Sequence, residues 1–317
     1  MNQFQWKYTL SDTSICIEAN ELLKDFSDNG CAPLIIDALT DSVLRIHTRT
    51  TPSFAIETLP KAAGHLQQIS DTAGLVLETS SLRLTLDDQL KLQIADLDGQ
   101  ILCADYTGPK QTAETLSEEE LEQMRMEGHA VSDSDNACRY TIYKQTSPDE
   151  KFYGLGDKTG VLNKRGYDYI MWNSDLPDPH VENNTFRALY KSIPFFISLS
   201  SRGVYGIFFD NHFKSFFDMG YNSKDYYSFG AVSGDLDYYF IHGKTIAEVI
   251  TQYTALTGRS PLPQLWTLGY HQSRWSYYSA QEVLELARTF RKYDIPCDAI
   301  HLDIDYMDHF KVFTVDK

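Results

Sequence analysis

The stretch from Pro261 to Lys317 constrains the fold most, because it contains a well-specified helix between two short strand patterns. Ser279 and Glu282 have the S-x-x-E spacing of a capping box, in which a hydroxyl and a carboxylate accept hydrogen bonds from backbone N–H groups at the helix start. Apolar residues then recur at helical spacing, at Val283, Leu286, Ala287 and Phe290. Pro296 ends the helix because it donates no backbone hydrogen bond. The sequence therefore predicts a short helix with one apolar face.

Strand patterns lie on both sides of this helix, at residues 266–271 and 299–302. Two strands joined by such a helix predict a parallel, right-handed βαβ unit. Ligands of parallel sheets and barrels gather at the carboxyl ends of the strands. The residues at those two ends are His271, Arg274 and Trp275 after the first strand, and Asp303, Ile304 and Asp305 after the second.

The region before residue 260 has a different pattern, with many short strands separated by turn residues. These strands are predicted at residues 14–18, 42–48, 75–79, 82–86, 90–94, 140–143, 193–199, 204–209 and 236–241. Such spacing favours an antiparallel sandwich over βαβ repeats. A helix at 245–256 is followed by a Gly- and Pro-rich segment at 258–263, where we place the boundary between domains 1–260 and 261–317.

Two segments interrupt the predicted sandwich. Residues 112–136 contain a second capping-box pattern, Ser117 with Glu120, and we interpret them as a solvated helical insertion. Residues 165–190 form a long polar loop of a kind that is often functional. Asp175 lies in this loop, where it either contacts a ligand or ends a turn, and the sequence does not decide between the two roles.

Charge and cysteine content exclude several classes of function. The 317 residues contain 28 Lys and Arg against 44 Asp and Glu, a net charge of −16, which argues against nucleic acid or an anionic membrane as partner. The sequence contains no apolar run of membrane-spanning length and no signal-peptide pattern, so we expect a soluble, cytoplasmic protein. Five scattered cysteines without C-x-x-C spacing argue against a disulfide framework and a zinc site.

Several ordered segments resemble glycoside hydrolase family 31, the α-glucosidases and α-xylosidases. The segments are FYGLGDKTG, RGYDYIMWNSD, LYKSIPFF, YGIFFDN, LDYYFI, YTALTGRSPLPQLW, GYHQSRWSY and LDIDYMD. The resemblance implies a mixed fold: an antiparallel β-sandwich of the galactose-mutarotase type, followed by the first βαβ unit of a (β/α)8 barrel. It also implies chemistry without a metal or organic cofactor.

The resemblance implies roles for four residues. Asp303 is expected to bind hydroxyls of the non-reducing sugar, because a carboxylate accepts charge-assisted hydrogen bonds. Trp275 is expected to lie against the same sugar, since an aromatic face suits its apolar C–H surface. Ile304 is expected to shape the pocket as in the α-glucosidases, and Asp175 to reach the neighbouring subsite. The competing interpretations are a structural carboxylate for Asp303 and an interface aromatic for Trp275.

Two residues near the strand ends have a structural interpretation that we favour. His271 and Arg274 are predicted to form a structural polar cluster under the barrel rather than to take part in catalysis. Asp303 and Asp305 lie two residues apart at the end of the second strand pattern, and one of them is expected to face the barrel mouth. We therefore do not expect them to form the pair of carboxyl groups that glycoside hydrolysis uses.

An eight-stranded barrel needs about 250 residues, far more than 261–317 provide. The resemblance places the nucleophile and general acid on later strands, so no catalytic residue is assigned in this chain. We expect the amino-terminal part of a retaining α-glucosidase that acts on terminal α-linked glucose and is inactive by itself. The alternatives are α-xylosidase or another α-glycosidase specificity, and a non-catalytic carbohydrate-binding module. The expected partner is an α-glucoside oligosaccharide, and homo-oligomerisation stays open.

Overall fold

The computed structural model describes residues 5–27, 30, 32–49, 53–60, 64–70, 74–111, 122, 126, 138–158, 160–173 and 189–317. The chain divides into two compact units, Met1–Gly258 and Arg259–Lys317. The predicted insertion at 112–136 lies outside the described residues, apart from Glu122 and Met126, which are both helical.

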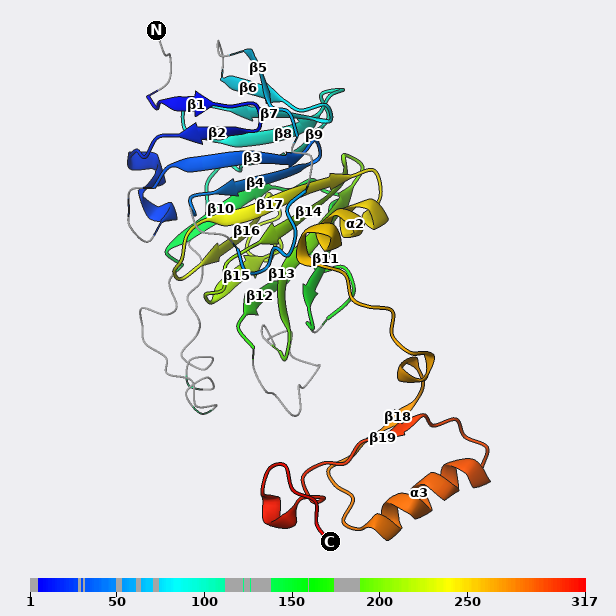
Figure 1. Cartoon of the computed structure of the whole chain (residues 1–317). Helices are drawn as coiled ribbons and strands as arrows, with labels where there is room; N and C mark the ends of the chain where they lie inside the picture. Colours follow the sequence, from blue (N-terminus) through cyan, green and yellow to red (C-terminus); the bar gives the residue numbers. More distant parts are fainter. Residues whose placement is uncertain are drawn as a thin grey trace. The chain divides into compact units, whose positions relative to one another are not determined.

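The first unit consists almost entirely of strands (Figure 1). Its elements are β1 (Tyr8–Leu10), β2 (Ser14–Ile17), η1 (Glu21–Phe26), β3 (Leu34–Thr40), β4 (Val43–His47), β5 (Gln67–Ser70), β6 (Leu75–Glu78), β7 (Leu82–Leu86), β8 (Leu92–Asp96), β9 (Ile101–Ala104), β10 (Tyr140–Gln145), β11 (Lys151–Gly156), β12 (Asp168–Met171), β13 (Ser192–Ser200), β14 (Gly203–Phe209), β15 (Ser215–Asp218), β16 (Tyr226–Ala231), β17 (Asp237–Gly243) and α2 (Ile246–Thr257).

These strands form three antiparallel sheets. The 8-stranded sheet has the order β1-β2-β3-β4-β17-β14-β13-β11, the 5-stranded sheet runs from β5 to β9 in chain order, and the 4-stranded sheet has the order β10-β16-β15-β12. Buried and partly exposed residues alternate along strands such as β3 and β7, because successive side chains point to opposite faces of a sheet. The prediction of an antiparallel β-sandwich is confirmed.

The centre of this unit is a cluster of buried aromatic side chains. Phe196 on β13 is fully buried, and its ring contacts Phe152, Phe217 and Tyr227 at centroid distances of 5.8, 6.2 and 5.4 Å. These edge-to-face pairs come from β11, β15 and β16. The aromatic rings therefore tie the 8-stranded sheet to the 4-stranded sheet.

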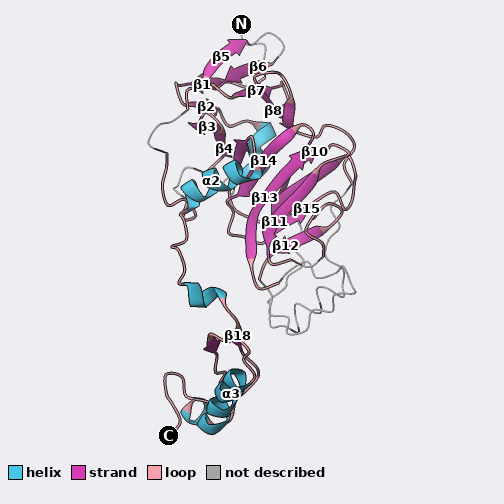
Figure 2. Ribbon diagram, turned by 90° about the vertical axis from the view of Figure 1, so that its right-hand side faces the viewer, coloured by secondary structure: helices cyan, strands magenta, loops and turns pink. Residues whose placement is uncertain are grey.

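Helix α2 packs on the 8-stranded sheet (Figure 2). Thr245 caps it by accepting a hydrogen bond from the backbone N–H of Glu248 at 3.2 Å. Val249 and Leu256 are buried in an apolar cluster with residues of β13, β14 and β17, and the Tyr253 ring stacks on Phe195 at 3.9 Å. The helix predicted at 245–256 is confirmed.

The second unit contains η3 (Leu265–Leu268), β18 (His271–Gln272), α3 (Ala280–Lys292), β19 (Ala299–Ile300) and η4 (Asp308–Phe310). Strands β18 and β19 pair in parallel, so the predicted βαβ unit is confirmed. The strand prediction was wrong for residues 266–268, which belong to η3. An alternating apolar pattern too short to distinguish a strand from a helical turn caused this error.

The capping box of α3 forms with one difference from its ideal pattern. The Ser279 hydroxyl accepts from Glu282 N at 3.1 Å. The Glu282 carboxylate accepts from Tyr278 N at 2.9 Å, one residue before the cap. Both hydrogen bonds satisfy backbone donors at the helix start.

Candidate functional site

The candidate site lies at the carboxyl ends of β18 and β19. His271 pairs with Ala299 and Gln272 with Ile300, and His301 N extends the ladder by donating to Gln272 O at 2.9 Å. Trp275 lies three residues after the end of β18, and Asp303 lies three residues after the end of β19. The parallel register therefore places both predicted sugar-binding residues after the same end of the two-stranded sheet.

The predicted site residues are open to solvent. Trp275 is 81% exposed and Ile304 is 43% exposed, and Asp303 is also exposed. Within the described part of the chain, no hydrogen bond or ion pair engages the Asp303 carboxylate, and no hydrogen bond joins it to Trp275. These side chains are thus free to contact a ligand.

The loop that carries Trp275 is held by its neighbours. Ser276 and Tyr277 are buried, and Gln272 Nε2 donates to the Tyr277 hydroxyl at 3.1 Å. The Arg274 guanidinium lies 5.9 Å from the centroid of the Tyr277 ring. The loop is therefore anchored by Ser276 and Tyr277, directly after the exposed Trp275.

A histidine pair connects the two strands. His271 Nδ1 and His301 Nε2 are 2.9 Å apart, and one of these nitrogens must donate to the other. The rings stack with centroids 5.1 Å apart, and Trp266 stacks on His271 at 5.9 Å. His271 was predicted from the sequence and His301 was not, although its place at the end of the second strand pattern was the available signal.

The strand geometry expected for Asp303 and Asp305 was wrong. β19 ends at Ile300, and residues 304–306 form a bend and turn, with Met307 N donating to Ile304 O at 3.1 Å. The alternation of a strand therefore does not determine where these two carboxylates point.

Asp175 lies outside the described residues, so its predicted role stays a prediction. Among the residues that the structure describes, no group of three or more His, Cys, Asp or Glu could hold a metal ion. In the same residues, no helix is both long and apolar enough to cross a membrane.

Comparison with known families identifies both units. Residues 33–218 match the description "Glycosyl hydrolase 31 N-terminal galactose mutarotase-like domain". The chain belongs to glycoside hydrolase family 31. Residues 260–317 match "Glycosyl hydrolases family 31 TIM-barrel domain", so the second unit corresponds to part of the family's barrel.

Two curated relatives of this family 31 chain are α-glucosidases. Alpha-glucosidase 2 of Bacillus thermoamyloliquefaciens is 49% identical over 175 residues, which are 55% of this chain and 22% of the relative. The α-glucosidase of Saccharolobus solfataricus is 35% identical over 179 residues, 55% of this chain and 24% of the relative. The chain thus spans less than a quarter of the length of these relatives.

Solved structures agree with the fold. A family 31 dextranase from Flavobacterium johnsoniae, complexed with isomaltotriose, superposes with a TM-score of 0.72 at 32% identity over 95% of this chain and 34% of the dextranase. The glucosidase II alpha subunit superposes with a TM-score of 0.72 at 21% identity, over 98% of this chain and 39% of that one. This second similarity concerns the fold.

Proposed function

We propose that the protein containing this chain is a retaining α-glucosidase, and that the chain supplies the front of its sugar subsite. The observation that carries the proposal is the placement of exposed Trp275 and Asp303 after the carboxyl ends of two parallel strands. Active sites of (β/α)8 barrels lie at that end of the strands. The 49% identity to an α-glucosidase supports the substrate class.

Each exposed residue has a chemical role in this proposal. The Asp303 carboxylate accepts hydrogen bonds from adjacent hydroxyls of the terminal glucose, and ionised acceptors make hydrogen bonds about twice as strong as neutral ones. The Trp275 ring covers the apolar C–H face of the same glucose. Ile304 limits the space beside the sugar. These contacts bind and orient the sugar, and the bond-breaking step needs two further carboxyl groups.

The catalytic carboxyl groups are proposed to come from barrel strands that follow residue 317 in the complete protein. In a retaining mechanism one carboxylate attacks the anomeric carbon, and the other carboxyl group protonates the leaving oxygen and then activates water. Residues 1–317 then supply a binding surface that is inactive without those strands.

The test replaces Asp303 by Asn in the protein with a complete barrel and measures hydrolysis of para-nitrophenyl α-glucoside. We expect kcat/KM to fall by about 100-fold or more, because losing a charge-assisted hydrogen bond costs about 1.5–3 kcal/mol and Asp303 makes more than one. Glu285→Gln removes an exposed charge from α3 and serves as the matched control. Unchanged kcat/KM in Asp303→Asn would contradict the role of this carboxylate.

Substrate preference within the family is tested with the same enzyme. We expect release of glucose from the α-glucoside to exceed release of xylose from the corresponding α-xyloside. Ile304→Ala should lower the ratio of glucose release to xylose release, because it removes apolar surface beside the sugar. A kcat/KM that is higher for the xyloside than for the glucoside would contradict the α-glucosidase proposal and favour an α-xylosidase.

A further inference from the structure

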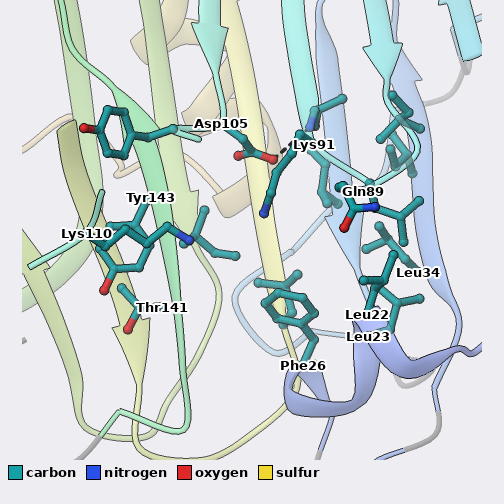
Figure 3. Close-up of a pocket in the computed structure, with 18 residues that line it drawn as sticks. Leu22, Leu23, Phe26, Leu34, Gln89, Lys91, Asp105, Lys110, Thr141 and Tyr143 are labelled. Carbon is teal, nitrogen blue, oxygen red and sulfur yellow. Dashed lines mark hydrogen bonds between the residues drawn. The ribbon is translucent and has the colours of Figure 1, made fainter. Parts of the chain in front are cut away.

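A cavity of about 190 Å³ lies within the first unit (Figure 3). It is lined by residues of η1, β3, β4, β7, β8 and β10, so elements of all three sheets surround it. Its apolar part includes Leu34, Ile36, Leu86 and Leu92, which are all buried. An engineered apolar cavity of about 150 Å³ binds benzene, and this cavity is therefore large enough for a phenyl group.

The polar end of the cavity is positively charged. Figure 3 shows Lys91, Lys110 and Asp105 among the lining side chains. The Asp105 carboxylate is already engaged, because Lys144 Nζ donates to it at 2.7 Å and Leu92 N at 2.8 Å. Among the described residues, neither Lys91 nor Lys110 forms an ion pair. Within that described part of the chain, two ammonium groups at the cavity have no carboxylate in an ion pair, although the net charge of the whole sequence is −16.

Lys110 lies beside an aromatic ring and close to a second positive charge. Its Nζ lies 4.7 Å from the centroid of the Tyr143 ring. Burial and the nearby charge of Lys91 lower the pKa of Lys110, while Asp105 raises it. A bound anion between the two lysines would remove their mutual repulsion.

The turn before β8 is strained in a way that shapes this cavity. Leu90 has φ 56, a left-handed conformation that is unfavourable for a residue with a side chain. Asp87 Oδ1 holds the turn by accepting from Gln89 N at 2.9 Å and Lys91 N at 2.8 Å. The turn places Leu90 in the lining together with Lys91. Strained residues of this kind cluster at ligand clamps.

We propose that this cavity binds a small amphipathic carboxylate, with its apolar body among the leucine and isoleucine side chains and its carboxylate between Lys91 and Lys110. Burial of the apolar body and charge-assisted hydrogen bonds to the two ammonium groups both favour binding. A sugar fits this lining poorly, because its hydroxyls would be buried against apolar side chains without partners. The cavity is lined by residues of the first unit, whereas Trp275 and Asp303 belong to the second.

The test titrates the chain with hydrocinnamate in a calorimeter near neutral pH, where the carboxylate is ionised. We expect saturable binding to one site, and a Kd at least tenfold higher in the double variant Lys91→Gln/Lys110→Gln. Lys151→Gln, at an exposed lysine of β11, should leave the Kd unchanged. Both lysines of the double variant lie at the polar end of the cavity, so the fold is expected to persist, and its unfolding midpoint is measured as a check.

Two further probes separate the contributions of charge and apolar body. Hydrocinnamamide, which has the same body without the charge, should bind at least tenfold more weakly than hydrocinnamate. Inorganic phosphate should also bind at least tenfold more weakly, because it has no apolar body. Absence of saturable hydrocinnamate binding, equal binding by the double variant, or equal binding of phosphate would each overturn the proposal.

Discussion

The two units of the chain differ in how they bury their apolar residues. In the first unit, the rings of Phe152, Phe196 and Phe217 are fully buried between sheets. In Arg259–Lys317, all of which is described, the buried residues are Ser276, Tyr277 and Cys297, and α3 contains none. The sandwich covers its own apolar faces, whereas the βαβ unit leaves its helix and sheet largely uncovered.

Sheet type explains this difference. Antiparallel strands joined by short turns form sheets that pack face to face within one continuous segment. Parallel sheets are covered on both faces by helices and neighbouring strands, and a single βαβ unit supplies one helix. We therefore expect the stability of the first unit to reside in its own core, and that of the second unit to depend on what packs against it.

The largest expected effect is the loss of a central ring from the sandwich. Phe196→Ala should lower the free energy of unfolding by about 3–5 kcal/mol, because it leaves a cavity among three aromatic neighbours. Leu284 on α3 is 54% exposed. Leu284→Ala should therefore change the free energy of unfolding by less than about 0.5 kcal/mol. Urea unfolding followed by tyrosine and tryptophan fluorescence measures both. An equal loss of unfolding free energy in the two variants would contradict the proposed difference between the two units.

The next effect concerns ion pairs. Asp105→Asn leaves the buried Lys144 ammonium without its carboxylate and should cost about 3 kcal/mol. The matched pair in the second unit joins Lys311 to Asp308 at 3.3 Å with both side chains solvent-exposed. Asp308→Asn should therefore change stability by less than about 1 kcal/mol. A negligible cost for Asp105→Asn in urea unfolding would show that the buried charge is tolerated unpaired.

The same lysine predicts a pH dependence. Burial acts to lower the pKa of Lys144, but Asp105 and Tyr238 hold it well above its usual value. The folded pKa is higher than the unfolded one, so this contribution is present below about pH 10.5 and is lost as the pH rises through the folded pKa. Wild type should therefore lose more stability than Asp105→Asn on alkaline unfolding.

Each unit has a helix capped by a side-chain hydroxyl, and removing either cap should have a smaller effect on stability. Thr245→Ala and Ser279→Ala each remove a cap worth about 1 kcal/mol. In α2, which packs on the sandwich, the loss should lower the global unfolding midpoint. In α3 it should raise amide exchange locally and leave that midpoint unchanged. A global shift from Ser279→Ala would mean that the two units unfold together.

A second lysine has the opposite pH sign to that of Lys144. Burial lowers the pKa of Lys158 to about 8, and its Nζ donates to Ile170 O at 3.1 Å. The folded pKa lies below the unfolded one, so this lysine makes stability rise with pH between about pH 8 and pH 10.5. Lys158→Met should flatten that rise relative to wild type, and exposed Lys292→Met should leave it unchanged.

Local sequence patterns predicted most strands and both helices of the described chain. The predicted strand at 82–86 coincides with β7, and the predicted cap at Ser279 forms. Pairings such as β4 with β17 join segments far apart in sequence, so no local pattern specifies them. The strand predicted at 140–143 continues to Gln145 in β10. Lys144 is buried there because Asp105, 39 residues earlier in the sequence, forms an ion pair with it, and no local pattern shows that partner.

The candidate site was predictable to a similar degree. The βαβ pattern was sufficient to place Trp275 and Asp303 after the ends of neighbouring parallel strands. It could not give the direction of Asp303, because that depends on a turn after β19, nor the contact between His271 and His301. These details depend on contacts between segments that the helix separates in sequence.

The most direct test of the proposed division of labour compares hydrolysis of para-nitrophenyl α-glucoside by residues 1–317 and by a protein in which the barrel is complete. We predict activity in the complete barrel and none in residues 1–317, because the proposal assigns sugar binding to Asp303 and Trp275 and the bond-breaking step to carboxyl groups of other strands. Hydrolysis by residues 1–317 at a comparable kcat/KM would contradict this division.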